Sequence, residues 1–99
     1  MDCEVVVSFP TREDITEIIR YISLDSPQSA VRFAHLLYSK TKILQTHPEM
    51  GRVVPEGKNS TIREIIVKSY RVIYNIDSKK KRVNVLRYWH AARGTPIWN

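Results

Sequence analysis

The chain has 99 residues, of which 42% are hydrophobic, and a formal net charge of +6 at pH 7. This length accommodates one domain with one modest core, so residues 1–99 are treated as a single domain. The single cysteine, Cys3, excludes an internal disulfide, and no apolar run approaches the ~20 residues of a membrane-spanning helix. Because the N-terminus also lacks a signal-peptide pattern, the sequence predicts a cytoplasmic protein that does not associate with membranes.

The charge is divided unevenly between the two halves of the chain. Residues 1–49 hold five Lys/Arg against seven Asp/Glu, a net charge of −2. Residues 50–99 hold eleven Lys/Arg against three Asp/Glu, a net charge of +8. An asymmetry of this size favours an acidic partner or a nucleic acid, while a basic surface that only keeps the protein soluble remains the alternative.

The first half of the chain predicts one strand and two helices. Residues 3–9 are rich in β-branched side chains and predict a strand that ends at Pro10. The Thr11–Asp14 segment resembles a capping box, which places the first helix at about Thr11–Leu24. Ser26 and the proline after it then start a second helix at about Pro27–Thr46. The short connection predicts an antiparallel helical hairpin.

The second half predicts three consecutive strands, at about Ile62–Lys68, Tyr70–Ile76 and Arg82–Trp89. Their short connections predict an antiparallel meander with Tyr70–Ile76 as the central strand. The helical hairpin is the available cover for its apolar face. The expected fold is therefore α+β with the order β-α-α-β-β-β, an antiparallel helical hairpin packed on one face of a small, mainly antiparallel sheet.

Strict alternation assigns the side chains of each strand to two faces. On the last strand it groups four residues on one side: Val83, Val85, Arg87 and Trp89. Asn84, Leu86, Tyr88 and His90 are assigned to the other side. Both sides carry apolar groups, so the pattern leaves open which of them meets the helices.

Four stretches, in this order of elements, resemble a known family. They are residues 48–56 (PEMGRVVPE), the Arg63-Glu64 pair, residues 70–74 (YRVIY) and residues 89–93 (WHAAR). From about Val5 to Arg93 the chain is similar to the ParE/RelE toxin superfamily of type II toxin–antitoxin modules, often described as plasmid stabilisation proteins. The resemblance implies no cofactor and an acidic cognate antitoxin that forms a hetero-oligomer with the toxin. No histidine has a Cys or acid at ligand spacing, so no metal site is expected.

The superfamily has two branches with different targets. RelE-like members are ribosome-dependent mRNA endoribonucleases, which would place catalysis here on Arg71, His90 and Arg63. ParE-like members are described as inhibitors of DNA gyrase and need no catalytic residues. Glu64 stands where a lysine would suit the ribonuclease, and residues 94–99 contain no Tyr or His. The resemblance therefore favours the ParE-like branch, with DNA gyrase as the partner, and the ribosome and mRNA are the alternative.

Five residues are expected to bind the target or the antitoxin: Arg63, Arg71, Arg87, Arg93 and Trp98. For some of these residues, and for Arg52 and His90, the sequence leaves a structural alternative open. Arg63 and Arg71 would pair with Glu64 or Glu56 and fix the sheet, Arg52 would pair with Glu56 in a loop, and His90 would orient the C-terminal turn.

Overall fold

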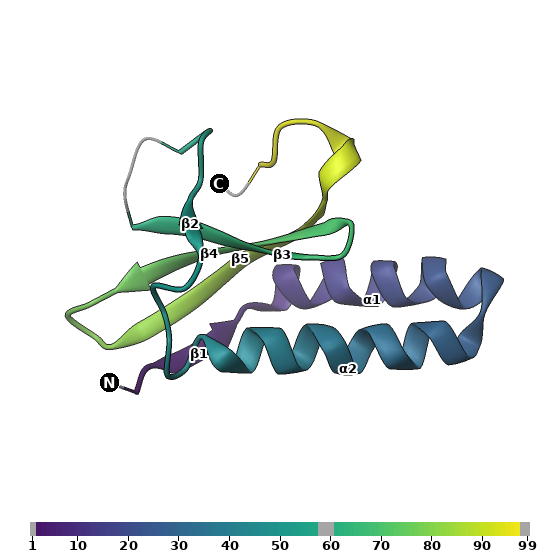
Figure 1. Ribbon diagram of the computed structural model, residues 1–99, viewed down its shortest axis with the longest axis horizontal. Coiled ribbons are helices and arrows are strands. Elements are labelled where there is room, and N and C mark those ends of the chain that lie inside the picture. Colours follow the sequence, from purple (N-terminus) through teal and green to yellow (C-terminus); the bar gives the residue numbers. More distant parts are fainter. Residues whose placement is uncertain (1, 58–60, 98–99) are drawn as a thin grey trace.

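The computed structural model describes residues 2–57 and 61–97, which form a layer of two helices against a sheet (Figure 1). The elements follow in the order β1 (Glu4–Val7), α1 (Phe9–Asp25), α2 (Pro27–Ile43), β2 (Arg52–Val53), β3 (Ile62–Val67), β4 (Tyr70–Asp77), β5 (Arg82–His90) and a 3-10 turn, η1 (Ala91–Arg93). The predicted α+β class and the helical hairpin on one face of the sheet are confirmed. Strand β2 is an addition that the sequence patterns did not predict.

The sheet has the strand order β1-β5-β4-β3-β2, with β4 at its centre as predicted. Strand β1 runs parallel to β5, and Val5 lies opposite Val83. The other pairs are antiparallel, and Ile65 on β3 lies opposite Val72 on β4. The long helical connection after β1 permits the parallel pairing, because parallel strands cannot be joined by a tight turn.

Helix α1 begins earlier than the sequence predicted. Its N-cap is Ser8, and Pro10 lies in the first helical turn instead of ending the strand. Proline is tolerated there because the first N–H groups of a helix have no intrahelical partner. Thr11 is therefore not the cap: it is 2% exposed. Its hydroxyl lies within hydrogen-bond distance of the carbonyl oxygens of Val85 (3.2 Å) and Leu86 (3.0 Å), which ties α1 to β5.

Helix α2 begins as predicted and ends earlier. The side chain of Ser26 accepts a hydrogen bond from the backbone N–H of Ser29 at 3.2 Å, which makes Ser26 the N-cap. The helix ends at Ile43, and residues 44–46 form a turn. The loop that follows is held by Tyr74, whose hydroxyl donates to the carbonyl oxygen of Pro48 at 2.7 Å.

Both faces of the central strand are buried, against different partners. On the helix side, a core of buried residues joins both helices to the sheet: Ile18, Phe33, Leu37, Ile65, Val67, Val72, Tyr74, Val83, Val85 and Tyr88. On the other side, Val54, Ile62, Ile73 and Trp89 form a smaller cluster with Leu86 against it. This second cluster means that the face without helices is not a bare, wet surface.

A register shift in β5 overturns the strict alternation expected there. Ile73 lies opposite Arg87, whereas its neighbour Tyr74 lies opposite Val85, so Leu86 is the extra residue of a bulge. Val85 consequently belongs to the helix-side core, while Trp89 belongs to the cluster on the opposite face. The sequence patterns had grouped Val85 and Trp89 on one side, and the bulge is the reason that this grouping is wrong.

Replacing Tyr74 with phenylalanine tests the anchoring of the 47–51 loop. The Tyr74 side chain is 0% exposed, and its hydroxyl also accepts from the Gly51 N–H at 3.0 Å. Tyr74→Phe leaves a buried donor and acceptor unsatisfied, so the free energy of unfolding in urea should fall by about 1–3 kcal/mol. Tyr38→Phe is the control, because Tyr38 is 66% exposed and should change little. Equal losses in the two variants would contradict the anchoring role.

Candidate functional site

We call the face of the sheet opposite the helices the open face. Two segments rise over it, the loop at residues 54–57 and the C-terminal segment at residues 91–97 (Figure 1). Of the residues that the sequence patterns assigned to binding or catalysis, Arg71 of β4 and Arg87 of β5 contact these two segments. The open face is therefore a candidate functional site.

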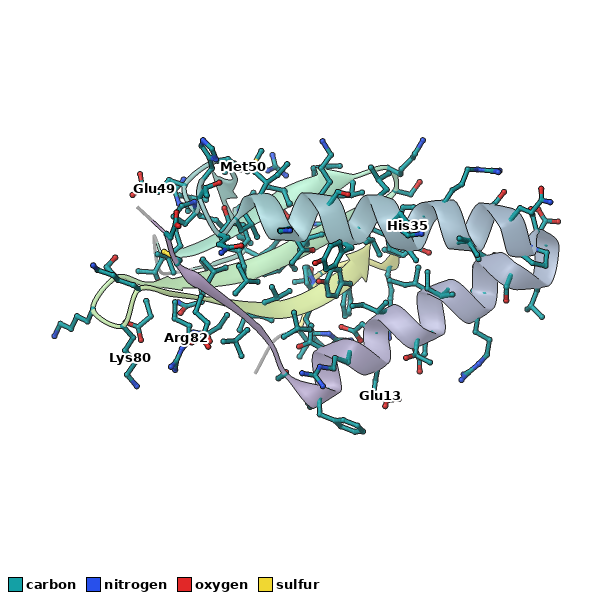
Figure 2. All side chains as sticks on the ribbon, turned by 90° about the horizontal axis from the view of Figure 1, so that it is seen from below. Glu13, His35, Glu49, Met50, Lys80 and Arg82 are labelled. Atoms are coloured by element: carbon teal, nitrogen blue, oxygen red, sulfur yellow. The ribbon has the colours of Figure 1, made fainter. Side chains whose placement is uncertain are left out.

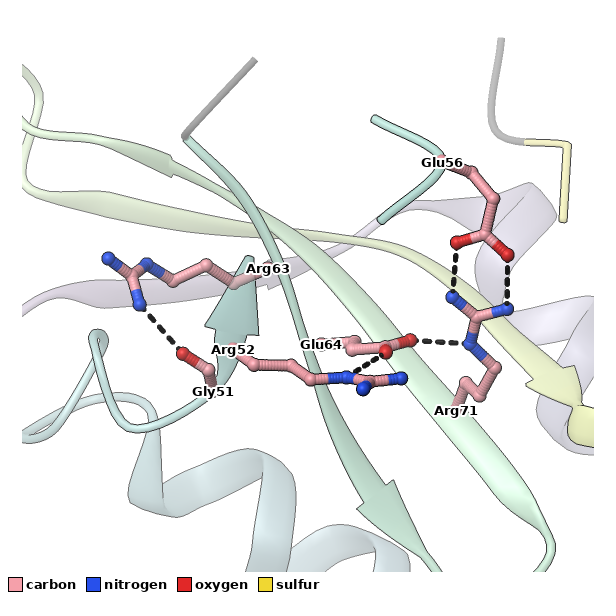
Figure 3. A network of polar contacts seen from close by, with 6 residues as sticks. All are labelled: Gly51, Arg52, Glu56, Arg63, Glu64 and Arg71. Carbon is pink, nitrogen blue, oxygen red and sulfur yellow. Dashed lines mark hydrogen bonds and ion pairs between the residues drawn. The ribbon is translucent and has the colours of Figure 1, made fainter. Parts of the chain in front are cut away.

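A buried carboxylate lies at the centre of this face. The side chain of Glu64 on β3 is 0% exposed, and it accepts hydrogen bonds from the Nε atoms of two arginines (Figure 3). Arg52 on β2 donates at 2.6 Å, and Arg71 on β4 donates to the other oxygen. A buried carboxylate requires such partners, because an unpaired buried charge is strongly unfavourable. The network joins β2, β3 and β4 through their side chains.

Arg71 extends the network to the loop. Its two terminal nitrogens donate to the two carboxylate oxygens of Glu56, at 2.7 and 3.0 Å. The hydrogen bond that Arg71 donates to Glu56 raises the pKa of Arg71, burial lowers it, and the hydrogen bond to Glu64 raises it further. Arg71 is thus paired with both glutamates, which confirms the structural alternative for this residue. Arg52 pairs with Glu64, so the expected Arg52–Glu56 bridge is wrong.

The four residues of this ion-pair network carry two positive and two negative charges. The Arg71 side chain is only 10% exposed, so its guanidinium is occupied and largely shielded. A site that binds phosphate by charge needs cations without internal carboxylate partners. The ion-pair network of Arg52, Arg71, Glu56 and Glu64 does not offer them in this arrangement.

Arg63 lies on the other face of the sheet. It is opposite Tyr74, and its neighbours along β3, Ile65 and Val67, belong to the helix-side core. One terminal nitrogen donates to the carbonyl oxygen of Gly51 at 2.7 Å, as Figure 3 shows. Arg63 therefore fastens the loop before β2, and its carboxylate pairing anticipated from sequence is not found among the described residues.

His90 also lies away from Arg71. Its Nδ1 accepts from the backbone N–H of Ala92 at 3.1 Å, which caps the C-terminal 3-10 turn. The ring packs edge-on against Tyr70, which in turn contacts Phe33 of α2. The structure does not bring Arg63, Arg71 and His90 together: Arg71 lies on the open face, and the other two are on the helix side.

The C-terminal segment is fastened to the open face by β5. Arg87 forms a two-point ion pair with Asp14 of α1, at 2.8 and 2.9 Å, and donates to the carbonyl oxygen of Ile97 at 2.9 Å. The Arg93 guanidinium lies 4.4 Å above the centre of the Trp89 ring. Sequence reasoning missed Asp14 as the partner of Arg87. Trp98, expected to bind a partner, lies outside the described residues.

A second feature is an apolar groove of about 700 Å³ beside the edge strand β1. It runs along both helices, and its lining residues are mostly apolar, including Val5, Val7, Ile15, Ala34, Leu37 and Tyr38. Arg12 and Lys42 add positive charge to its lining. Glu4 is the acid of the lining, and it pairs with Arg82. The groove thus offers an apolar floor, two cations and a strand edge, which together suit an amphipathic, acidic segment.

Residues 2–57 and 61–97 contain no group of three His, Cys, Asp or Glu side chains arranged to hold a metal ion. Within the same ranges, no helix is both long and apolar enough to cross a membrane.

Comparisons with known proteins point to one family. A family model described as the ParE toxin of the type II toxin–antitoxin system parDE matches residues 5–94. A chromosomal ParDE system from P. aeruginosa has a similar structure, with a TM-score of 0.71, 16% identity, and coverage of 89% of this chain and 95% of that one. None of the curated proteins compared with the sequence matches it.

Two RelE-related structures are also similar in fold. The toxin–antitoxin complex RelBE2 from Mycobacterium tuberculosis gives a TM-score of 0.63 at 18% identity, covering 91% of this chain and 99% of that chain. A mutant of the E. coli toxin RelE in the free state gives 0.64 at 14% identity, covering 95% of this chain and 88% of that chain. At these identities the likeness concerns the fold alone.

The pH dependence of stability tests the Arg71–Glu56 pair. The hydrogen bond from Arg71 lowers the pKa of Glu56 below its ordinary value of 4.5, although burial raises it. The unfolded chain then takes up the proton first, so the stabilisation is present above pH 4.5 and is lost as the pH falls through the lower folded pKa. Glu56→Gln should lose stability at pH 7 and show a smaller further loss below pH 4.5 than the wild type, measured by urea unfolding.

Glu13→Gln is the matched control, because Glu13 is an exposed glutamate of α1. It should keep the wild-type loss of stability on acidification. A Glu56→Gln variant with the same acid dependence as Glu13→Gln would show that the pair does not contribute.

Proposed function

Because the chain belongs to the ParE toxin family of type II toxin–antitoxin systems, we propose that it arrests DNA gyrase by binding it, without catalysis. The observation that carries this proposal is the paired state of the open-face arginine. Arg71 is held by Glu56 and Glu64. Gyrase and the ribosome are both cytoplasmic targets, so the proposal places the chain in the cytoplasm.

The chemistry of RNA cleavage explains why this pairing matters. Cleavage by the RNA's own 2′-hydroxyl needs a group that takes up its proton, cations that stabilise the phosphorane, and an acid for the leaving oxygen. Arg71 is committed to two carboxylates, and His90 lies on the other face beside Tyr70. A carboxylate beside Arg71 also repels phosphate. A toxin that acts by binding a protein has none of these requirements.

The alternative is a ribosome-dependent endoribonuclease. It is favoured by the similarity of the fold to two RelE-related structures and by the presence of Arg71 on β4. In this alternative, Glu56 would have to leave Arg71 when RNA binds. The two functions differ in which cellular process stops first, so they are separable by experiment.

Controlled expression of the toxin alone in a bacterium tests the target. DNA, RNA and protein synthesis are labelled separately after induction. Gyrase inhibition predicts that DNA synthesis falls first and that double-strand breaks appear while mRNA stays intact. Purified chain should likewise stop supercoiling by gyrase. Translation that stops first, with mRNA cut on ribosomes, would contradict the gyrase proposal.

His90→Ala separates the two functions at the level of one residue. If His90 only caps the 3-10 turn, the variant should arrest growth as the wild type does. If His90 were a general acid or base, activity should fall by about 10²–10⁴-fold. The readout is the inducer concentration that halves the growth rate, with the level of folded protein measured in parallel.

We also propose that the cognate antitoxin binds in the apolar groove beside β1. Its lining combines apolar residues from both helices and β1 with the positive charges of Arg12 and Lys42. An acidic, amphipathic antitoxin segment would bury its apolar face in the groove and place its acids near these two side chains. The edge of β1 offers backbone groups for pairing with an extended segment.

Tyr38→Glu tests the antitoxin surface. Tyr38 is 66% exposed and lines the groove, so a carboxylate there should repel the acidic antitoxin and weaken the rescue of growth by the co-expressed antitoxin. Tyr21→Glu is the matched control, because Tyr21 is 71% exposed and does not line this groove. Equal rescue of the two variants would place the antitoxin elsewhere. Both variants should remain toxic when expressed alone.

A further inference from the structure

Several arginines of the second half of the chain are paired with acids. On β2, β4 and β5, Arg52 and Arg71 are paired with glutamates, and Arg87 with Asp14. By contrast, the turn between β4 and β5 holds three consecutive exposed lysines, residues 79–81. We call this turn the lysine tip.

The lysine tip has no acidic partner for its ammonium groups within the described residues. Asp77 and Glu4 lie near the turn and make other contacts. Asp77 accepts a hydrogen bond from the backbone N–H of Lys80 at 3.1 Å, which fixes the turn. Glu4 pairs with Arg82 at 3.2 Å. Three adjacent like charges without a partner repel one another, so an anionic ligand that lies along them lowers their free energy.

The position of the tip makes it accessible. In Figure 1 the β4–β5 hairpin projects at one end of the long axis, and the connection between α1 and α2 lies at the opposite end. Figure 2 shows Lys80 and Arg82 at this projecting end, with Lys80 directed away from the body of the protein. In the hairpin Asp77 lies opposite Arg82, and β1 flanks β5 as far as Arg82, which lies opposite Glu4, so only the turn at residues 78–81 lies beyond the paired strands. The hairpin ends in the small Ser78 and the lysines.

We propose that the lysine tip binds the phosphate backbone of double-stranded DNA. Duplex DNA carries about one charge per 1.7 Å of axis, which is the density that a compact group of lysines can neutralise with release of counterions. Its major groove, about 12 Å wide, accommodates a two-stranded β-ribbon and therefore also the narrower turn at residues 78–81. The major groove of duplex RNA is deep and narrow, so the same turn reaches fewer phosphates there. Shape thus favours DNA over RNA.

The expected binding does not depend on DNA sequence. Lysine is a point charge that contacts phosphate, and sequence is read by side chains that reach the edges of bases. The lining of the antitoxin groove includes none of the three lysines, although the tip borders the groove through Glu4, whose N–H donates to the carbonyl oxygen of Lys81 at 2.9 Å. The inference goes beyond the proposed function, since it assigns a ligand to a part of the surface that neither gyrase inhibition nor antitoxin binding requires.

The test measures how DNA binding depends on salt. The chain of residues 1–99, made by cell-free synthesis, is titrated against a fluorescent DNA duplex of mixed sequence at about 50–200 mM salt. In the variant Lys79→Gln/Lys80→Gln/Lys81→Gln, the slope of log affinity against log salt concentration should be smaller in magnitude by about 2–3 than in the wild type. Its thermal unfolding should match the wild type, because all three side chains are exposed.

The matched control removes three other lysines, in the variant Lys40→Gln/Lys42→Gln/Lys68→Gln. It carries the same net charge and should keep the wild-type salt slope. Equal loss of slope in the two triple variants would show that net charge alone drives binding, and would overturn the proposal. Tighter binding of a duplex RNA of the same length would also overturn it. The DNA-binding assay contains no gyrase, so its result does not depend on whether the gyrase proposal is correct.

Discussion

The buried carboxylate of Glu64 is the constraint on which the open face depends. Its side chain is 0% exposed, and removing such a charge from water costs several kcal/mol. Arg52 and Arg71 compensate for that cost, and each belongs to a strand that borders β3. Arg71 in turn holds Glu56, so the loop at residues 54–57 is placed by the same network. The side-chain contacts among β2, β3 and β4, and the position of the loop over the open face, thus depend on the charge of Glu64.

This network also determines the electrostatics of the site. An arginine that is free on a sheet binds phosphate, whereas one that is held by two glutamates contributes little positive potential. The fold alone does not make this distinction, because ParDE and RelE-related structures both resemble the chain at 14–18% identity. Function therefore rests on the side chains placed on a shared scaffold. Here they neutralise Arg52 and Arg71 on the open face and leave unpaired charge on the lysine tip.

Local patterns in the sequence determined the order of the elements. The Thr11–Asp14 segment and the Ser26 cap predicted both helices, although α1 begins at Phe9, because capping patterns are properties of nearby residues. The short connections between the last three strands predicted the meander with β4 at its centre. The sequence also contained both glutamates that pair with Arg71, and it presented that pairing as one of two alternatives.

Only the tertiary structure decided how the two sheet faces are composed. The bulge at Leu86 moves Trp89 and Val85 to opposite faces, and no local pattern marks it. Strand β2 has two residues, too few for a periodicity to be read. Thr11 contacts Leu86, 75 residues away in sequence, and is therefore buried instead of capping α1. Such contacts join distant segments, so they depend on the packing of the whole chain, whereas helix and strand patterns are encoded within a few residues.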